Sequence, residues 1–338
     1  MRKVSPGTAA QVVTGVAVIV VIFYFLGRGL AANWDELRSE EIDVQPALLV
    51  LGAAFVLGDF LLRIIIWTEL LSQLSGGTRF PLGRSAIVFL YSWVGRYVPG
   101  KVAYPVGRFY LGRSLGASTP ALVGSIGYET VLVAVAAFGF ASVTVVPSLA
   151  VVSDSVLPYL ALPAVAIGGV VALHPRVLRW GLALVLRLLG REFITDAWLL
   201  PPRQMARLIA LYFVAFSLSG VGFYLLIISL TPYGVGYLPL AAGAFTLAGV
   251  MGMVMLIAPA GIGVREGFLV GVLQFTMPVE LAILISLVAR AWATALDVLV
   301  VGGAFAFDYV SGERMLFAAF SGRQRMEAVG DPSAALDP

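Results

Sequence analysis

Apolar runs separated by short polar loops make up most of the 338-residue chain. The runs that are long enough to cross a bilayer core of about 30 Å cover residues 11–30, 47–72, 119–145, 157–173, 205–230 and 280–306. This pattern predicts an all-α polytopic membrane protein with about six full spans. The first run follows Arg2 and Lys3 and is too long for the core of a signal peptide, so we expect it to remain as a span.

Two further apolar segments are broken by proline and glycine. The first covers residues 85–112, with predicted breaks at Pro99, Gly100 and Pro105, and the second covers residues 238–277, with predicted breaks at Pro259, Gly261 and Gly263. The arm before Pro99 is about 21 Å long as a helix, which is too short to cross. The chain is therefore expected to enter and return on one side, as a re-entrant hairpin. The first arm of the second segment leaves room for a full crossing followed by a short return.

The distribution of basic residues predicts the orientation, because cytoplasmic loops carry an excess of Lys and Arg. Arg2 and Lys3 place the N-terminus in the cytoplasm, and the acidic loop 31–45 then lies outside. Residues 176–191 form an amphipathic pattern with four arginines on one side, typical of a helix on the cytoplasmic leaflet. Residues 311–338 are predicted to be a disordered cytoplasmic tail. We therefore expect a multi-pass protein of the cell (plasma) membrane with both termini cytoplasmic.

With this orientation the chain divides into two halves that share one order of elements. Residues 1–156 contain two spans, a hairpin from the inside and a third span, and residues 157–310 contain two spans, a hairpin from the outside and a third span. The same order in opposite orientations is an inverted-topology repeat, which in transporters brings the binding site to the bilayer midplane. The two hairpins are expected to meet there.

Composition limits the kinds of function. Hydrophobic residues make up 60% of the chain and charged residues only 12%, whereas soluble domains have about 25% charged residues. The net charge of +3 is concentrated in loops, so it indicates topology and not a nucleic-acid partner. The chain has no cysteine and a single histidine, His174, which excludes disulfides, thiolate sites and His-based triads or metal clusters. Since nucleotide-binding and nucleophile motifs are absent too, we expect no enzymatic activity, no cofactor and no metal.

Two sequence motifs lie at the predicted hairpins. Residues 94–118 read VGRYVPGKVAYPVGRFYLGRSLGAS and precede Tyr128-Glu129, and residues 258–273 read APAGIGVREGFLVGVL and precede SLVARAWATALDVLV. These motifs resemble the flippase-like family related to the membrane domain of bacterial lysylphosphatidylglycerol synthase/flippase. The second motif departs from the family's Pro-Gly-Gly-Ile-Gly-x-Arg-Glu turn at Ala260.

The resemblance implies the membrane part of these proteins. Only about 30 residues follow the last predicted span, so it gives no support for the lipid aminoacylation carried out by the soluble domain of the bifunctional members. The family also has members linked to isoprenoid-lipid glycosylation, so the resemblance does not identify the lipid.

Basic residues surround the break of the first hairpin. Arg96, Lys101 and Arg108 can bind a lipid phosphate, helped by backbone amides that are freed where a helix restarts. The alternative is that they snorkel to the cytoplasmic surface and anchor the hairpin.

The second hairpin has one acidic residue next to a basic one. Adjacent residues of a helix point about 100° apart, so Arg265 and Glu266 are each expected to have another partner. Arg265 can bind a phosphate and Glu266 a headgroup amine. The alternative is a structural clamp that holds the hairpin.

Ionisable residues also lie within the predicted spans. Glu129, Arg290 and Asp297 interrupt otherwise apolar runs, as residues of transport pathways do. The alternative is a Glu129–Arg290 ion pair that ties the two halves together. Asp59 and Arg63 are four residues apart, and we expect them to form an intrahelical pair.

These observations lead to the hypothesis of a lipid flippase, an integral membrane protein that moves a phospholipid or another phosphate-bearing lipid between leaflets. The predicted substrate-binding residues are Arg96, Lys101, Arg108, Glu129, Arg265, Glu266, Arg290 and Asp297. One alternative is a membrane transferase that acts on a polyprenyl-phosphate-linked sugar. Another is a non-transporting accessory subunit of a lipid-modifying enzyme or glycosyltransferase in polyprenyl-phosphate-linked glycan assembly.

Overall fold

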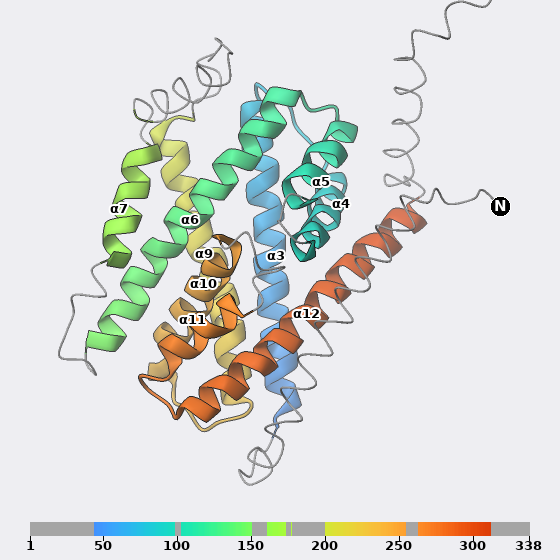
Figure 1. The fold of residues 1–338 in the computed structure, drawn as a ribbon. Coiled ribbons are helices and arrows are strands. Elements are labelled where there is room, and N and C mark those ends of the chain that lie inside the picture. The colour runs from blue at the N-terminus through green and yellow to red at the C-terminus, as the bar shows by residue number, and fades with distance from the viewer. Residues whose placement is uncertain are drawn as a thin grey trace, which may run out of the picture.

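The computed structural model describes residues 44–98, 103–150, 161–173, 177, 200–254 and 263–311. These residues are helical apart from short connections (Figure 1). The predicted first span 11–30 lies outside the described residues, as does all but one residue each of the predicted surface helix 176–191 and the tail 311–338. Those three predictions remain predictions.

The helices fall into two length classes. The long ones are α3 (Pro46–Leu74), α6 (Thr119–Ala150), α9 (Pro202–Ile228), α10 (Leu238–Val254) and α12 (Val279–Val310). The short ones are α4 (Leu82–Trp93), η1 (Val94–Tyr97), α5 (Ala103–Gly112), η2 (Arg113–Leu115), α7 (Ala161–Leu173), η5 (Val235–Tyr237) and α11 (Val264–Leu273). Among the described residues, α3, α6, α9, η5 with α10, and α12 are long and apolar enough to cross a membrane. The predicted class, an all-helical polytopic membrane protein, is confirmed.

The two hairpins have first arms of different length. α4 has 12 residues, whereas the stretch Val235–Met253 is long enough to span. The difference follows from the sequence, since Arg96 closely follows α4, whereas no charged residue occurs in the second hairpin before Arg265. The first arm of the second hairpin is therefore long enough for the full crossing that the sequence left open. The predicted span 157–173 is described only from Ala161, as the 13-residue α7.

The molecule buries charged side chains and exposes apolar ones. Arg108 is 0% exposed and Glu129 is 6% exposed, whereas Val143 on the same helix as Glu129 is 62% exposed. On α12, Leu299 is 60% exposed while Asp297 is 5% exposed. This is the reverse of the distribution in a soluble protein. It is expected where the outer surface faces lipid and the polar groups face the bundle interior.

Helix contacts repeat between α3–α6 and α9–α12. If α3, α4, α5 and α6 are matched in order with α9, α10, α11 and α12, each inter-helix contact in one set has a counterpart in the other. The first arm of each hairpin packs against the last span of the other set, α4 against α12 and α10 against α6. The second arm packs against the last span of its own set, α5 against α6 and α11 against α12. Each hairpin is thus held between the last span of its own set and the last span of the other set.

The matched helices α3 and α9 run in opposite directions. The Gln45 amide before α3 donates to the Ser229 carbonyl after α9 at 3.0 Å, and at the other end Arg207 of α9 lies 3.0 Å from Glu69 of α3. The chain enters the first hairpin from the end of α3 and the second from the end of α9, so the hairpins begin at opposite ends of the bundle. Figure 1 shows them approaching each other near mid-height.

A pair of glycines permits the crossing of α3 and α9. A Cβ atom added to Gly52 would lie 2.8 Å from the Gly222 carbonyl oxygen, and one added to Gly222 would lie 2.8 Å from the Gly52 carbonyl oxygen. Small residues at membrane helix crossings allow backbones to approach this closely. The contact is reciprocal, so a side chain on either glycine would require the two helices to shift.

We expect Gly52→Ala to lower the free energy of unfolding by about 1–3 kcal/mol, because the new methyl group meets a backbone atom that cannot rotate away. Thermal unfolding of the purified protein in detergent measures this. The matched control is Gly58→Ala on the same helix, where a Cβ would meet only the end of the Leu218 side chain, at 3.6 Å. Equal melting temperatures for the two variants would contradict this account of the crossing.

Candidate functional site

Most of the predicted site residues fall within the described part of the chain. Lys101 and the predicted breaks Pro99, Gly100, Pro259 and Gly261 lie outside the described residues. The break predicted at Pro105 is wrong, because Pro105 lies in the first turn of α5, where proline is tolerated. Gly263 immediately precedes α11, with a φ of +82°.

The two arms of the first hairpin approach closely at Gly95. A Cβ atom there would lie 2.5 Å from backbone atoms of Ala103 and Tyr104, so only glycine fits at this position. The close approach brings Ser92 of α4 alongside Arg108 of α5, where the Arg108 Nε donates to the Ser92 Oγ at 3.1 Å.

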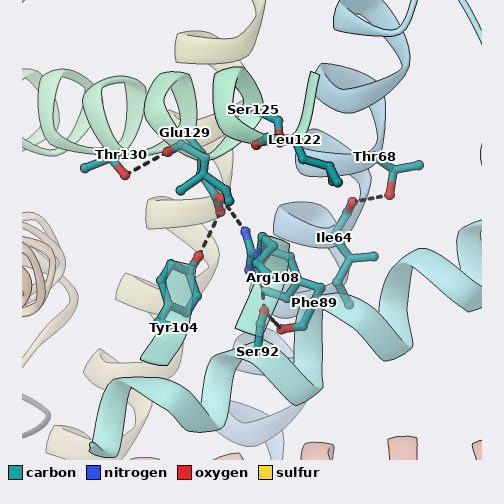
Figure 2. A network of polar contacts seen from close by, with 11 residues as sticks. Ile64, Thr68, Phe89, Ser92, Tyr104, Arg108, Leu122, Ser125, Glu129 and Thr130 are labelled. Carbon is teal, nitrogen blue, oxygen red and sulfur yellow. Dashed lines mark hydrogen bonds and ion pairs between the residues drawn. The ribbon is translucent and has the colours of Figure 1, made fainter. Parts of the chain in front are cut away.

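Arg108 and Glu129 form a buried ion pair between α5 and α6. Figure 2 shows Glu129 pointing from α6 towards Arg108 and Tyr104 of α5, and the Tyr104 hydroxyl donates to the Glu129 Oε1 at 3.3 Å. A buried charge is tolerated when it is paired and hydrogen-bonded. This pair therefore fixes the returning arm of the first hairpin to the last span of its own set.

Aromatic rings surround the Arg108 guanidinium. Its central carbon lies 4.0 Å from the ring centre of Phe89, 4.6 Å from that of Tyr104 and 4.9 Å from that of Trp67. Cation–π contacts of this kind stabilise arginine away from water. Arg108 does not reach the surface, so the snorkelling alternative does not describe it, and its burial favours a structural role.

The second hairpin has an ion pair of reversed polarity. Arg290 of α12 lies 3.5 Å from Glu266 of α11, with the acid now on the hairpin and the base on the span. The other Glu266 oxygen, Oε2, accepts a hydrogen bond from the Gly263 amide at 2.7 Å. Glu266 therefore caps the start of α11 and also links this helix to the last span of its set.

The alternative of an ion pair between Glu129 and Arg290 is wrong. Each of these residues pairs within its own set, Glu129 with Arg108 and Arg290 with Glu266. The reason is that the second arm of a hairpin, and not the opposite span, packs beside the last span. The expectation that Glu266 would have a partner other than its neighbour Arg265 is confirmed.

Asp297 of α12 connects the two sets. Its carboxylate pairs with Arg96, accepts from the Tyr97 hydroxyl, and accepts from the Trp93 Nε1 at 3.0 Å. The Arg96 guanidinium also lies 4.5 Å from the Trp93 ring centre. One carboxylate of the second set thus holds three side chains from the end of the first arm of the first hairpin. A second link joins the same helices, since the Tyr91 hydroxyl donates to Asp308 at 3.1 Å.

Several polar contacts were not found from the sequence. Trp93, Tyr97 and Tyr104 supply polar tips to the ion pairs, and in the sequence they look like ordinary aromatic residues of a membrane protein. Their clustering around the Pro99-Gly100 break was the one feature of the sequence that could have pointed to these contacts. The expected intrahelical pair of Asp59 and Arg63 is confirmed, with a separation of 2.7 Å.

Arg265 differs from the other charged residues of this region. It is half-buried, and its guanidinium carbon lies 4.8 Å from the ring centre of Phe245. In the part of the chain that the structure describes, it has neither an ion pair nor a hydrogen bond from its side chain. Its electrostatic neighbours come from both hairpins and from α12, namely Arg290, Glu266, Arg96 and Asp297. Arg265 is thus a cation near the meeting point of the hairpins, and its guanidinium N–H groups donate to none of the described residues.

The comparisons with known proteins agree with the fold. A family model described as the lysylphosphatidylglycerol synthase TM region matches residues 12–301, which is most of the chain and includes both hairpins. No curated protein matches the chain.

Removing one partner of the buried pair should destabilise the protein strongly. We expect Glu129→Ala to lower the free energy of unfolding by about 3–5 kcal/mol, because Arg108 is left buried without a counter-charge. The double variant Arg108→Met with Glu129→Met should recover most of this loss, since apolar replacement of a whole buried pair is often neutral. Thermal unfolding in detergent measures both.

The control for this comparison is Glu280→Ala, at an exposed position in the first turn of α12. It should melt like the wild type. A Glu129→Ala protein as stable as the control would show that the pair does not hold α5 against α6.

Proposed function

Since the chain belongs to the lysylphosphatidylglycerol synthase transmembrane family, we propose that it is a lipid flippase, which moves a phospholipid or another phosphate-bearing lipid between the leaflets of the plasma membrane. It would work without ATP hydrolysis and without enzymatic chemistry of its own. Its N- and C-termini would lie in the cytoplasm. Its partners would be the lipid, the surrounding bilayer and, where lipid synthesis is coupled to transport, a lipid-modifying enzyme.

The observation that carries this proposal is the Arg265 side chain, which has no ion pair or hydrogen bond with the described residues. The other arginines that enter the meeting region of the hairpins are engaged by carboxylates, Arg96 by Asp297 and Arg290 by Glu266. A guanidinium offers several N–H donors in a fixed fork that matches a phosphate. A lipid phosphate beside Arg265 would supply the counter-charge that the described residues do not.

The arrangement of the hairpins supports movement between two exposures. Ion pairs hold the second arm of each hairpin to a span of its own set, whereas Asp297, Arg96 and their aromatic neighbours join one set to the other. In transporters with inverted repeats, one set of helices rocks against the other around a fixed site. The Asp297 contacts are those that such rocking would change, and the within-set pairs would move as rigid units.

A membrane transferase receives less support. Such an enzyme needs carboxylates that are free to act as bases or to bind a metal near water. Glu129 and Asp297 are instead buried and bound to arginines and to aromatic hydroxyl or indole groups. A direct transport assay distinguishes the flippase function from the accessory-subunit alternative.

We expect Arg265→Gln to reduce lipid translocation at least about tenfold, since a charge-assisted contact to phosphate is lost. The measurement is the fraction of fluorescent phosphatidylglycerol in proteoliposomes that becomes accessible to an external quencher over time. Arg113→Gln is the matched control, because Arg113 is exposed at the end of the first hairpin.

Melting temperatures of both variants should match that of the wild type, which separates loss of transport from loss of fold. Wild-type rates for Arg265→Gln would remove Arg265 from the lipid site. Absence of translocation by the wild-type protein would favour the accessory role.

A further inference from the structure

Resting on the proposed flippase function, we infer that the lipid headgroup reaches Arg265 along a buried polar face of α12, by parting α4 from α12. The matched contact between α6 and α10 stays closed. The lipid route therefore lies on one side of the molecule, although the two sets of helices have matching contacts.

The charged residues in the second half of α12 share one face. Arg290, Asp297 and Asp308 are separated by seven and eleven residues, which is close to two and three whole turns at about 3.6 residues per turn. All three are buried, and so is Thr294, which lies between the first two. Arg290 to Asp308 covers about 27 Å of helix, most of a bilayer core of about 30 Å. Buried ionisable residues of this kind mark substrate pathways in membrane proteins.

The first arm of the first hairpin covers this face. Asp297 accepts from Trp93 and pairs with Arg96, and Asp308 accepts from Tyr91. These contacts are made by polar side chains, which can exchange one partner for another. Near the start of α4, the helices meet only through the end of a side chain. A Cβ atom added to Gly83 would lie 3.7 Å from the Phe307 ring.

The matched contact between α10 and α6 is of the opposite kind. A Cβ atom added to Gly243 of α10 would clash with the Thr144 side chain and would lie 2.5 Å from the Val145 Cγ2. Neither α10 nor residues 130–150 of α6 contain a charged residue. Buried apolar side chains pack around this close contact, namely Ala141, Val145, Leu149, Leu240 and Leu247. A headgroup that passed here would lose its water without gaining a polar partner.

The polar face of α12 has no equivalent on α6. Glu129 of α6 matches Arg290 of α12, because each pairs with the returning arm of its own hairpin. Seven and eighteen residues after Arg290, α12 has Asp297 and Asp308, whereas α6 has Ala136 and Pro147 at the same distances from Glu129. The polar route is therefore present in one set only.

The inner end of this route reaches the proposed lipid site. Arg96 and Asp297 are both among the electrostatic neighbours of Arg265. A phosphate that enters between α4 and α12 can take Arg96 from Asp297, and Asp297 can then turn to Arg265. When the phosphate moves on to Arg265, Asp297 returns to Arg96. Breaking a buried pair is costly when one partner is left alone, and this exchange leaves no charge alone.

Cross-linking tests the route, because the chain has no cysteine of its own. Gly83→Cys with Phe307→Cys places two thiols across the contact of α4 with α12. Ser148→Cys with Pro239→Cys places them across the contact of α6 with α10, each one turn from Thr144 or Gly243. Both double variants are joined by a short bismaleimide linker and reconstituted with fluorescent phosphatidylglycerol in a phosphatidylcholine background. We expect the first link to slow translocation about tenfold or more, and the second to leave it within about twofold of the unlinked variant.

The outcomes separate the route from the flippase function. An unchanged rate after the first link, or a block by the second, would overturn the route and leave the flippase proposal standing. Movement of lipid by the wild type no faster than in protein-free vesicles, with a folded protein, would overturn both. The linker itself should not change the rate of the wild type, which has no thiol.

A pair of single variants tests the polar face without a linker. Thr294→Val removes a hydroxyl from this face at nearly constant volume, and we expect it to slow translocation about threefold or more. Thr130→Val on α6 is the matched control, because each hydroxyl donates to a carbonyl of its own helix, Arg290 for Thr294 and Ile126 for Thr130. Thr130 is exposed, and its variant should keep the wild-type rate. Equal rates for the two variants, with equal melting temperatures, would overturn the role of the α12 face.

Discussion

Placing a charged group in hydrocarbon costs about 2.5–3.5 kcal/mol on insertion scales, and this cost governs how the two hairpins are held. Each hairpin has a returning arm that is joined to the last span of its own set by one ion pair, Arg108–Glu129 in the first and Glu266–Arg290 in the second. The polarity of the pair is reversed between the sets, because the first hairpin carries the arginine and the second hairpin carries the glutamate. In both sets the pair joins a short helix to the last span. Breaking either pair would leave a charged group buried without its partner and would loosen the short helix from its span.

The same principle explains why contacts within and between the sets differ in kind. Within a set, an ion pair fixes a short helix to a long one. Between the sets, close glycine packing at Gly52 and Gly222 brings α3 against α9, and Asp297 gathers Arg96 with two aromatic side chains. Further polar contacts between the sets come from Asp308 and Glu69. The alternating exposure proposed for a flippase would have to change these contacts while the pairs within each set are kept.

The sequence predicted the long helices α3, α6, α9 and α12 and the local pair well, and the distant pairs poorly. Asp59–Arg63 follows from helix geometry alone, because residues four apart share a face. The alternative of a Glu129–Arg290 pair is wrong because the choice of partner depends on which short helix packs beside which span, and hydropathy carries no such information. Trp93 and Tyr97 were missed for a similar reason, since an aromatic residue that binds a carboxylate has the same sequence pattern as one that faces lipid. The sequence left open whether the first arm of the second hairpin, α10, makes a full crossing, because apolar composition does not show where a hairpin turns.

The central claim is that Arg265, whose side chain has no ion pair or hydrogen bond with the described residues, binds a lipid phosphate where the hairpins meet. Native mass spectrometry of the protein released from mild detergent tests it most directly, by identifying the lipid that remains bound. The account predicts an anionic phospholipid on the wild type and on Arg113→Gln, and its loss from Arg265→Gln. Equal retention of that lipid by Arg265→Gln would contradict it.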